Sequence, residues 1–368
     1  MAHVEKRGPG RWRARYRDPN NRERSRTFAR RIDAERWLTS VEHSKLSGAY
    51  IDPALARVTF GQWAEEWLTT PGKRSSSWAR DDSILRNHLL PTFESRGLGT
   101  LKPGEIQALV STWTAKAAPR TVRRQYDTLR AILNAAVAAD LIARSPCRGI
   151  RLPATTSTTR HVVDAEELAK LSEAMGECGP MAYLGAVLGM RWGECAGLRV
   201  GRLDVLRSTL HVAEQFTRGK GGAMVLEPPK SQAGRRTMAV PAALMALLAD
   251  HLACRGLTGA DADEWVFNAP EGGHLDYAHF RRRVWIPATK AAGVEGLEFH
   301  DLRRANATGM LLDGVDLKTA QTRLGHSDPR LTIAIYAQAT TAADAAAAER
   351  LGTRFMKFPR PARGLGAG

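Results

Sequence analysis

The chain has 368 residues, with 54 lysines and arginines against 38 aspartates and glutamates, a formal net charge of +16. This length allows two or three domains with at least one large core. This excess of positive charge favours a polyanionic partner such as nucleic acid. The alternative is a protein whose basic surface has no such partner. No run of apolar residues is long enough to span a membrane and the N-terminus has no signal core, so we expect a cytoplasmic protein without a membrane partner.

The four cysteines are scattered along the chain and form neither a CxxC pair nor a Cys/His cluster. This pattern predicts free thiols in a reducing compartment and no structural metal. No pair of carboxylates with the spacing of a metal site is evident either. We therefore expect neither a metal nor another cofactor.

Residues 1–55 predict a small three-stranded β-sheet with a helix behind it. They carry 13 lysines and arginines against 7 acidic residues. Apolar residues and arginines alternate over residues 12–16, so the arginines lie on one face of a strand. Turn residues at 18–21 then lead to a returning strand over 22–28. Arginines on the open face of such a sheet can enter a DNA groove, or the face can simply be solvated. The candidate DNA-binding residues are Arg13, Arg15 and Arg24.

Residues 48–57 predict a linker, and residues 58–153 predict an all-α bundle. Thr59 with Gln62 matches a capping box at the first helix start, and a second helix over 77–89 is expected to end at Pro91. A third helix runs from Pro103 to Trp113. The fourth, from 122 to 137, has the clearest helical periodicity and an arginine-rich side. Its candidate DNA-binding residues are Arg120, Arg123 and Arg124.

A polar hinge is expected at 155–159. The domain that follows, 160–356, is expected to be mainly α with a small antiparallel sheet. Asp164 with Glu167 predicts a helix start, and residues 181–197 predict one continuous helix. Residues 208–240 have β character, with a glycine-rich turn at 219–222. The chain then becomes helical from 277 to a last helix over 342–351, and the tail 357–368 is expected to be disordered. The predicted fold class is therefore α+β and multidomain.

Six residues of this last domain suit the cleavage of a phosphodiester by a protein hydroxyl. The hydroxyl must lose its proton, the non-bridging oxygens must be neutralised, and the leaving oxygen must gain a proton. Arginines clamp phosphate bidentately, lysine can donate a proton, and histidine titrates near neutral pH. Cations nearby also make a tyrosine easier to ionise. The candidates are Arg191, Lys230, His300, Arg303, His326 and Tyr336.

The spacing of these residues agrees with a shared site. His300 and Arg303 are three residues apart, so they share a face near a predicted helix start, where free N–H groups favour an anion. His326 follows a Leu-Gly pair that predicts a helix end. Each motif alone has an ordinary structural reading, such as a packed core position for Tyr336. Their joint order favours a catalytic set.

Taken together, the segment 160–352 resembles the catalytic domain of the tyrosine recombinases, in particular the phage-type integrases. The resemblance is carried by Gly-Met-Arg-Trp-Gly-Glu at 189–194, Lys230 before Gly-Arg-Arg at 234–236, His-Asp-Leu-Arg at 300–303, Leu-Gly-His at 324–326, and Tyr336. Upstream, 58–153 resembles the helical, SAM-like core-binding domain and 1–55 the arm-binding domain of this family. Two departures, Ala305 in place of Thr or Ser and the apolar run 333–335, affect local packing and leave the reaction intact.

The resemblance implies a role for each residue. Arg191 and Arg303 are expected to bind the scissile phosphate, and Lys230 to protonate the leaving 5′ hydroxyl. His300 is expected to assist proton transfer with Tyr336. His326 is expected to hydrogen-bond the phosphate, and Glu194 to hold an active-site side chain in place from the second shell.

The chain is thus predicted to be a site-specific DNA recombinase that works through a 3′-phosphotyrosyl intermediate and integrates or excises a phage or mobile element. The implied partners are double-stranded DNA at core and arm sites, a homotetramer on DNA that exchanges the helix 342–351, an accessory DNA-bending protein and an excision factor. The alternatives are a transposon integrase, a chromosome-dimer resolvase, which the N-terminal segment disfavours, and a non-catalytic DNA-binding relative.

Overall fold

The structure is a computed structural model that describes residues 2–19, 21–46, 50, 58–155, 161–330, 333, 348–352 and 354–355. The chain divides into two compact units, Met1–Ser157 and Thr158–Gly368. Tyr336, the tail 357–368, and most of the expected linker, hinge and last helix lie outside the described residues. Of the expected helix 342–351, residues 348–351 are described, and they are helical.

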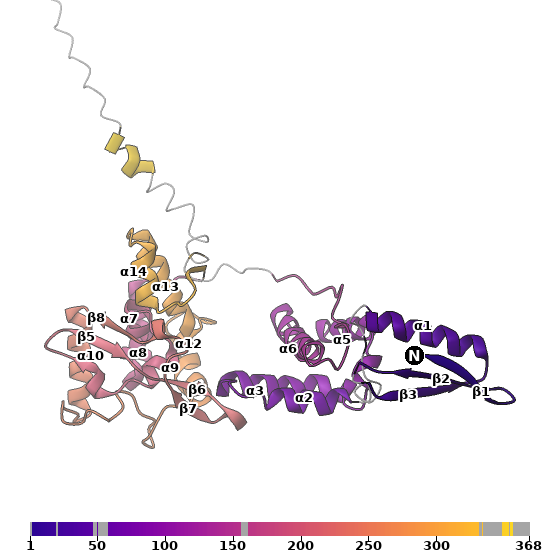
Figure 1. Ribbon diagram of the computed structural model, residues 1–368. Helices are drawn as coiled ribbons and strands as arrows, with labels where there is room; N and C mark the ends of the chain where they lie inside the picture. The colour runs from indigo at the N-terminus through magenta and orange to yellow at the C-terminus, as the bar shows by residue number, and fades with distance from the viewer. Residues whose placement is uncertain are drawn as a thin grey trace, which may run out of the picture. The chain divides into compact units, whose positions relative to one another are not determined.

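The first unit begins with an antiparallel sheet of three strands in the order β1-β2-β3 (Figure 1). The strands are β1 (His3–Gly8), β2 (Arg11–Arg17) and β3 (Glu23–Phe28), and α1 (Arg31–Leu46) packs across one face. The predicted alternation in β2 is confirmed, because Ala14 and Tyr16 are buried against α1. Arg13 and Arg15 therefore project from the opposite face, since successive strand residues alternate sides.

A helical bundle with its own apolar core follows in the same unit. Its helices are α2 (Phe60–Leu68), α3 (Ser75–Ile84), α4 (Leu90–Phe93), α5 (Pro103–Thr114) and α6 (Pro119–Ala138). The predicted capping box is confirmed: the Gln62 backbone N–H donates to Thr59 Oγ1 at 3.3 Å, and the Thr59 N–H donates to Gln62 Oε1 at 3.1 Å. Helix α6 carries the fully buried Leu129, Ile132 and Leu133 on one face, as its periodicity predicts.

The prediction that Pro91 ends the second helix is wrong. The chain stays helical from α3 through a π-helical turn, Leu85–Leu89, into α4. Proline lacks an N–H and its ring crowds the carbonyl four residues back, and a π-turn widens the helix at such a point. The same arrangement recurs in the second unit, where the π-turn Arg281–Trp285 precedes Pro287.

The second unit is mainly helical with two small antiparallel sheets, which confirms the predicted α+β class. Its helices are α7 (Ala165–Ala174), α8 (Pro180–Val187), α9 (Trp192–Ala196), α10 (Ala242–Cys254), α11 (Tyr277–Phe280), α12 (Ile286–Ala291), α13 (Phe299–Leu312) and α14 (Leu317–Leu324). Strands β4 (Leu203–Asp204), β5 (Thr209–Val212) and β8 (Arg236–Ala239) form one sheet in the order β4-β5-β8, and β6 (Gln215–Arg218) pairs with β7 (Met224–Glu227). The helix start predicted at Asp164 is confirmed by its capping box with Glu167.

Both units also contain short 3-10 turns. They are Leu98–Thr100 in the bundle and Gly176–Cys178, Val200–Arg202, Lys220–Gly222 and Gln232–Gly234 in the second unit. The turn Lys220–Gly222 lies between β6 and β7, where the glycine-rich turn was predicted.

Helix α8 lies in the core of the second unit and packs closely on α13. The approach is close because Gly185 has no side chain: a Cβ there would lie 3.1 Å from Leu302 Cβ. The predicted continuous helix 181–197 is wrong, since helix α8 ends at Val187 and α9 begins at Trp192. Gly189, with φ +65°, takes the left-handed conformation that breaks the helix. The break places Arg191 in an extended conformation at the start of α9.

We predict that Gly193→Ala destabilises the second unit, because α9 lies directly against β6 at this residue. A Cβ at Gly193 would lie 2.2 Å from the Phe216 carbonyl oxygen, a backbone atom with little freedom to move. Overpacking of this kind costs about 1–3 kcal/mol or more of unfolding free energy. Denaturant unfolding measures it, with Gly259→Ala as the control because a Cβ there would meet nothing within 4 Å. Equal losses in the two variants would contradict the prediction.

Candidate active site

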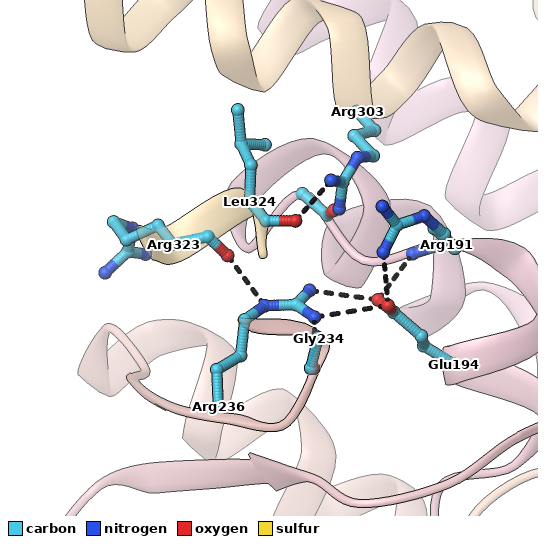
Figure 2. Close-up of polar contacts among 8 residues, drawn as sticks. Arg191, Glu194, Gly234, Arg236, Arg303, Arg323 and Leu324 are labelled. Carbon is cyan, nitrogen blue, oxygen red and sulfur yellow. Dashed lines mark hydrogen bonds and ion pairs between the residues drawn. The ribbon is translucent and has the colours of Figure 1, made fainter. Parts of the chain in front are cut away.

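A buried carboxylate, Glu194, lies at the centre of the candidate site, with 1% of its surface exposed. On one side, Arg236 Nη1 donates to Oε1 at 3.1 Å and Nη2 donates to Oε2 at 2.9 Å. On the other side, Arg191 Nη1 donates to Oε1 at 2.7 Å and the Arg191 backbone N–H donates to Oε2 at 3.0 Å. Figure 2 shows the two guanidinium groups on either side of this carboxylate. Both carboxylate oxygens thus accept charge-assisted hydrogen bonds.

The arginines keep Glu194 ionised despite its burial. Burial alone would raise the pKa of this carboxyl group, but the charge and hydrogen bonds of Arg236, and then those of Arg191, outweigh burial and lower it to about 2. The site therefore contains a permanent negative charge at neutral pH, and its arginines are held in place by it.

Arg236 is a residue of the site that the sequence reasoning missed. It is 6% exposed, and besides Glu194 it donates from Nε to the Arg323 carbonyl at 2.7 Å and from Nη1 to the Gly234 carbonyl at 3.1 Å. It thereby ties the start of β8 to the end of α14 (Figure 2). A signal was present in the sequence: Arg236 alternates in phase with Met238 and Val240, which are buried.

Arg303 on α13 lies close to both other arginines and is 3% exposed. Its guanidinium donates to the carbonyl of Gly189, in the break before α9, and to the carbonyl of Leu324, at the end of α14. Burial, followed by the charge of Arg191, lowers the pKa of Arg303 to about 9, so the group stays cationic at neutral pH. One side chain thus joins the helix break to the loop that carries His326.

The two histidines lie in the same cationic environment. The predicted helix end before His326 is confirmed, since Gly325 has φ +62° at the end of α14. Burial, followed by the charges of Arg303 and Arg191, lowers the pKa of His326 to about 4. His300 is exposed at the start of α13, but burial of part of its ring, followed by the same two arginines, also lowers its pKa. Both imidazoles are therefore neutral near pH 7.

Two predicted catalytic residues, Lys230 and Tyr336, remain. Lys230 is exposed in the connection between β7 and β8, six residues before Arg236. Tyr336 lies outside the described residues. The site observed in the structure thus comprises Arg191, Glu194, Arg236, His300, Arg303 and His326.

The predicted DNA-binding arginines of the sheet differ in their surroundings. On the open face, Arg13 Nη2 donates to Ser25 Oγ at 2.9 Å, and Arg15 forms ion pairs with Glu5 at 2.8 Å and Glu23 at 3.1 Å. Arg24 is opposite Tyr16 in the register, so it shares the face that α1 covers and does not belong to the open face. Its Nε lies 3.2 Å from the carboxylate of Asp18.

On α6, the three predicted arginines separate into two kinds. Arg120 and Arg124 are exposed and, being four residues apart, share one side of the helix. Arg123 is partly buried and its Nε donates to the Pro153 carbonyl at 2.9 Å, so it fixes the segment that follows the bundle. Arg120 and Arg124 are therefore the two of this set with exposed side chains.

The sequence also led to expectations about the cysteines, metal-binding side chains and membrane-spanning helices. All four cysteines, Cys147, Cys178, Cys195 and Cys254, are free thiols, as predicted. Within the described ranges, no three His, Cys, Asp or Glu side chains are grouped so as to hold a metal ion. In the same part of the chain, no helix is both long and apolar enough to cross a membrane.

We predict that Arg236→Met lowers the free energy of unfolding at pH 7 by about 3–5 kcal/mol, because it leaves a buried carboxylate with one of its two partners. The matched control is Arg235→Met, since Arg235 is the exposed neighbour. The loss depends on pH. Because the pKa of Glu194 is lower in the folded chain (about 2) than its unfolded value, its ion pairs stabilise the fold above the unfolded pKa, and this stabilisation disappears as the pH falls through 2.

The difference between wild type and Arg236→Met, measured by denaturant unfolding, is therefore expected to be constant from pH 7 to about 5 and to shrink towards pH 2. A difference that does not change over this range, or an equal loss in Arg235→Met, would contradict the role assigned to the pair.

Comparison with known proteins gives the same family along the chain. Residues 162–343 match the phage integrase family, residues 3–48 match the phage integrase N-terminal domain, and residues 59–114 match the phage integrase N-terminal SAM-like domain. The prophage phiRv2 integrase of Mycobacterium tuberculosis is 32% identical over 330 residues, which cover 86% of each chain.

Solved structures share the fold. The Tn1549 transposon integrase, in complex with transposon right end DNA, has a TM-score of 0.66 at 20% identity and covers 80% of this chain and 100% of its own. A lambda integrase dimer bound to a COC′ core site has a TM-score of 0.56 at 19% identity, with 90% and 93% covered. The sequence matches, the shared fold and the cluster around Glu194 agree, and the chain belongs to the phage integrase family and is a site-specific tyrosine recombinase.

Proposed function

We propose that the cluster around Glu194 binds the scissile phosphate of duplex DNA. The observation that carries this proposal is an excess of positive charge around one buried carboxylate. Arg191 and Arg236 bond to the single carboxylate of Glu194, and Arg303 lies close enough to feel its charge; these four groups carry a net charge of +2 while the histidines are neutral. A phosphodiester anion in contact with Arg191 and Arg303 offsets this excess.

The two phosphate-binding arginines have donors left for a ligand. Arginine has five N–H groups, and Arg303 uses two of them on the carbonyls of Gly189 and Leu324. Arg191 uses one on Glu194 and its side chain is 37% exposed. Arg191 is thus the arginine that DNA reaches first, and Arg303 is buried behind it, held by its two carbonyl partners.

The remaining residues act on protons. In the proposed reaction, the Tyr336 oxygen attacks the phosphorus, its proton passes to the neutral His300, and His326 donates a hydrogen bond to a non-bridging oxygen. The bond from phosphorus to the 5′ oxygen breaks, and Lys230 supplies the proton that makes the leaving group a 5′ hydroxyl. A 5′ hydroxyl of the partner strand then gives its proton back to Lys230 and attacks the 3′-phosphotyrosine; the phosphorus–tyrosine bond breaks, and the Tyr336 oxygen regains its proton from His300. The phosphotyrosyl bond keeps the energy for rejoining, so the reaction needs no ATP or other cofactor.

The three parts of the chain have separate tasks in this proposal. Residues 1–55 bind arm sites, residues 58–153 bind the core site, and residues 160–356 carry out the reaction. The protein acts in the cytoplasm, where it meets DNA. Four copies act together on DNA, with an accessory DNA-bending protein and an excision factor as further partners. The prophage name of the 32% identical relative supports a phage element as the mobile DNA.

Tyr336→Phe is predicted to abolish covalent capture of DNA and to leave duplex binding intact, because only the attacking oxygen is removed. The substrate is a nicked duplex with the attachment core from DNA flanking the gene, and a denaturing gel detects the covalent complex. Tyr183→Phe, a partly exposed tyrosine of α8, is the control. Strand transfer by Tyr336→Phe would refute the assignment.

The double variant Arg120→Ala/Arg124→Ala is predicted to bind DNA with lower affinity. Its affinity is also predicted to depend less steeply on salt concentration. If each exposed arginine contacts one phosphate, the slope of log K against log[salt] falls by about 1.8. Arg123→Ala is the matched control on the same helix, since its guanidinium already donates to Pro153. Binding measured over a range of salt concentrations tests this, and equal slopes in the wild type and both variants would count against a DNA contact by α6.

Deletion of residues 341–368 is predicted to reduce assembly of the synapse more than binding to a single duplex. The deleted segment contains the helix 342–351, which is proposed to pass to a neighbouring copy, and it leaves Tyr336 in place. Gel shifts with one and two duplexes separate the two steps. An equal loss of both would argue that the segment serves the fold or DNA binding and not assembly.

A further inference from the structure

The helix break that carries Arg191 is also held by Asn306, a residue of α13 with no assigned role. Asn306 Nδ2 donates to the Val187 carbonyl at 2.9 Å. Val187 is the last residue of α8, where the carbonyl groups of a helix have no partner within the helix. Asn306 thus satisfies the end of α8 from a helix that lies 119 residues later in the chain.

Arg303 contacts the same break from the same side of α13. Its guanidinium donates to the Gly189 carbonyl, and residues three apart lie on one face of a helix. Asn306 and Arg303 therefore fix the carbonyls of Val187 and Gly189, and Arg191 follows two residues later. Helix α13 therefore holds the backbone that leads to Arg191 at two carbonyl groups, those of Val187 and Gly189.

The fit between Asn306 and Gly189 is specific. Gly189 has φ +65°, and a Cβ there would lie 2.7 Å from Asn306 Oδ1. Oδ1 is itself buried and has no hydrogen-bond partner among the described residues. A buried, unpaired acceptor costs free energy and calls for an explanation. An apolar residue of similar size would avoid this cost, so the benefit of asparagine lies in its donor to Val187.

We propose that Asn306 is a positioning residue for Arg191: by holding the end of α8, it sets where the Arg191 guanidinium meets the scissile phosphate. This inference rests on the proposed function, and Asn306 itself does not contact DNA in it. The alternative is a purely structural residue that contributes to stability alone.

The test compares Asn306→Leu and Asn306→Ala with the wild type. Leucine has the shape of asparagine without the donor or the unpaired acceptor, so it limits the loss of stability. Thr308→Ala is the matched control, a partly exposed residue of the same helix. We expect covalent capture of the nicked duplex to slow by about 10- to 100-fold in both Asn306 variants, as for a displaced catalytic group, with duplex binding close to that of the control and the melting temperature of Asn306→Leu closer to the control than that of Asn306→Ala.

A second substrate separates positioning from stability. When the scissile phosphate is a methylphosphonate, a methyl group replaces a charged non-bridging oxygen, and the reacting centre needs less help from a cation. The ratio of wild-type to variant rates is then expected to fall several-fold relative to natural DNA. The same ratio on both substrates, or a slowing that follows the loss of folded protein, would overturn the inference.

The outcomes also distinguish this inference from the proposed function. Covalent capture by the wild type with unchanged capture by Asn306→Leu would refute positioning and leave the recombinase mechanism intact. Absence of capture by the wild type on a substrate that it binds would refute the mechanism, and the inference with it.

Discussion

The candidate site depends on one buried ion pair network, that of Glu194 with Arg191 and Arg236. Like charges buried close together repel, and a buried charge without a partner is costly. Glu194 reduces the repulsion, and its own pKa of about 2 shows the reciprocal effect of the arginines. Since Arg236 also bonds to the backbone at the end of α14, the network joins α9, β8 and α14. The fold and the charge of the site are therefore set by the same contacts.

The helix break between α8 and α9 brings Arg191 and Arg303 together beside this network, and the two arginines can bind an anion. The left-handed Gly189 leaves carbonyls that α13 binds through Arg303 and Asn306, and Arg191 follows in an extended conformation at the start of α9. Burial, followed by the charge of the arginines, lowers the pKa values of His300 and His326 and so favours neutral histidines. Neutral imidazoles can accept or donate a proton, so the same positive charge that suits a phosphate also prepares these groups for proton transfer.

The sequence predicted well those features that depend on neighbouring residues. The capping boxes at Thr59 and Asp164, the alternation in β2 and the helix end at Gly325 all follow from local chemistry. The break at 188–191 was missed because the apolar pattern continues through it, and Pro91 was misread because a π-turn leaves no sequence pattern of its own. Arg24 was placed on the wrong face because the register of β3 depends on its partner strand.

Contacts between distant residues could not be read from spacing. Asn306 meets Val187 across 119 residues and Arg236 meets Glu194 across 42, and neither belongs to a local motif. The types of the predicted catalytic residues did identify the family, because the order Arg, Lys, His-x-x-Arg, His and Tyr is distinctive even where each part is common. Of these, the structure groups the arginines and histidines, and Tyr336 lies beyond the residues that it describes.

The most direct test of the account is the rate of covalent capture of a nicked duplex by Glu194→Gln, measured together with duplex binding. Glutamine keeps the shape of glutamate but removes the charge that holds Arg191 and Arg236. If one buried carboxylate orients the phosphate-binding arginines, capture falls by about 10-fold or more while binding is retained. Capture at the wild-type rate by a folded Glu194→Gln protein would contradict the claim that this carboxylate organises the site.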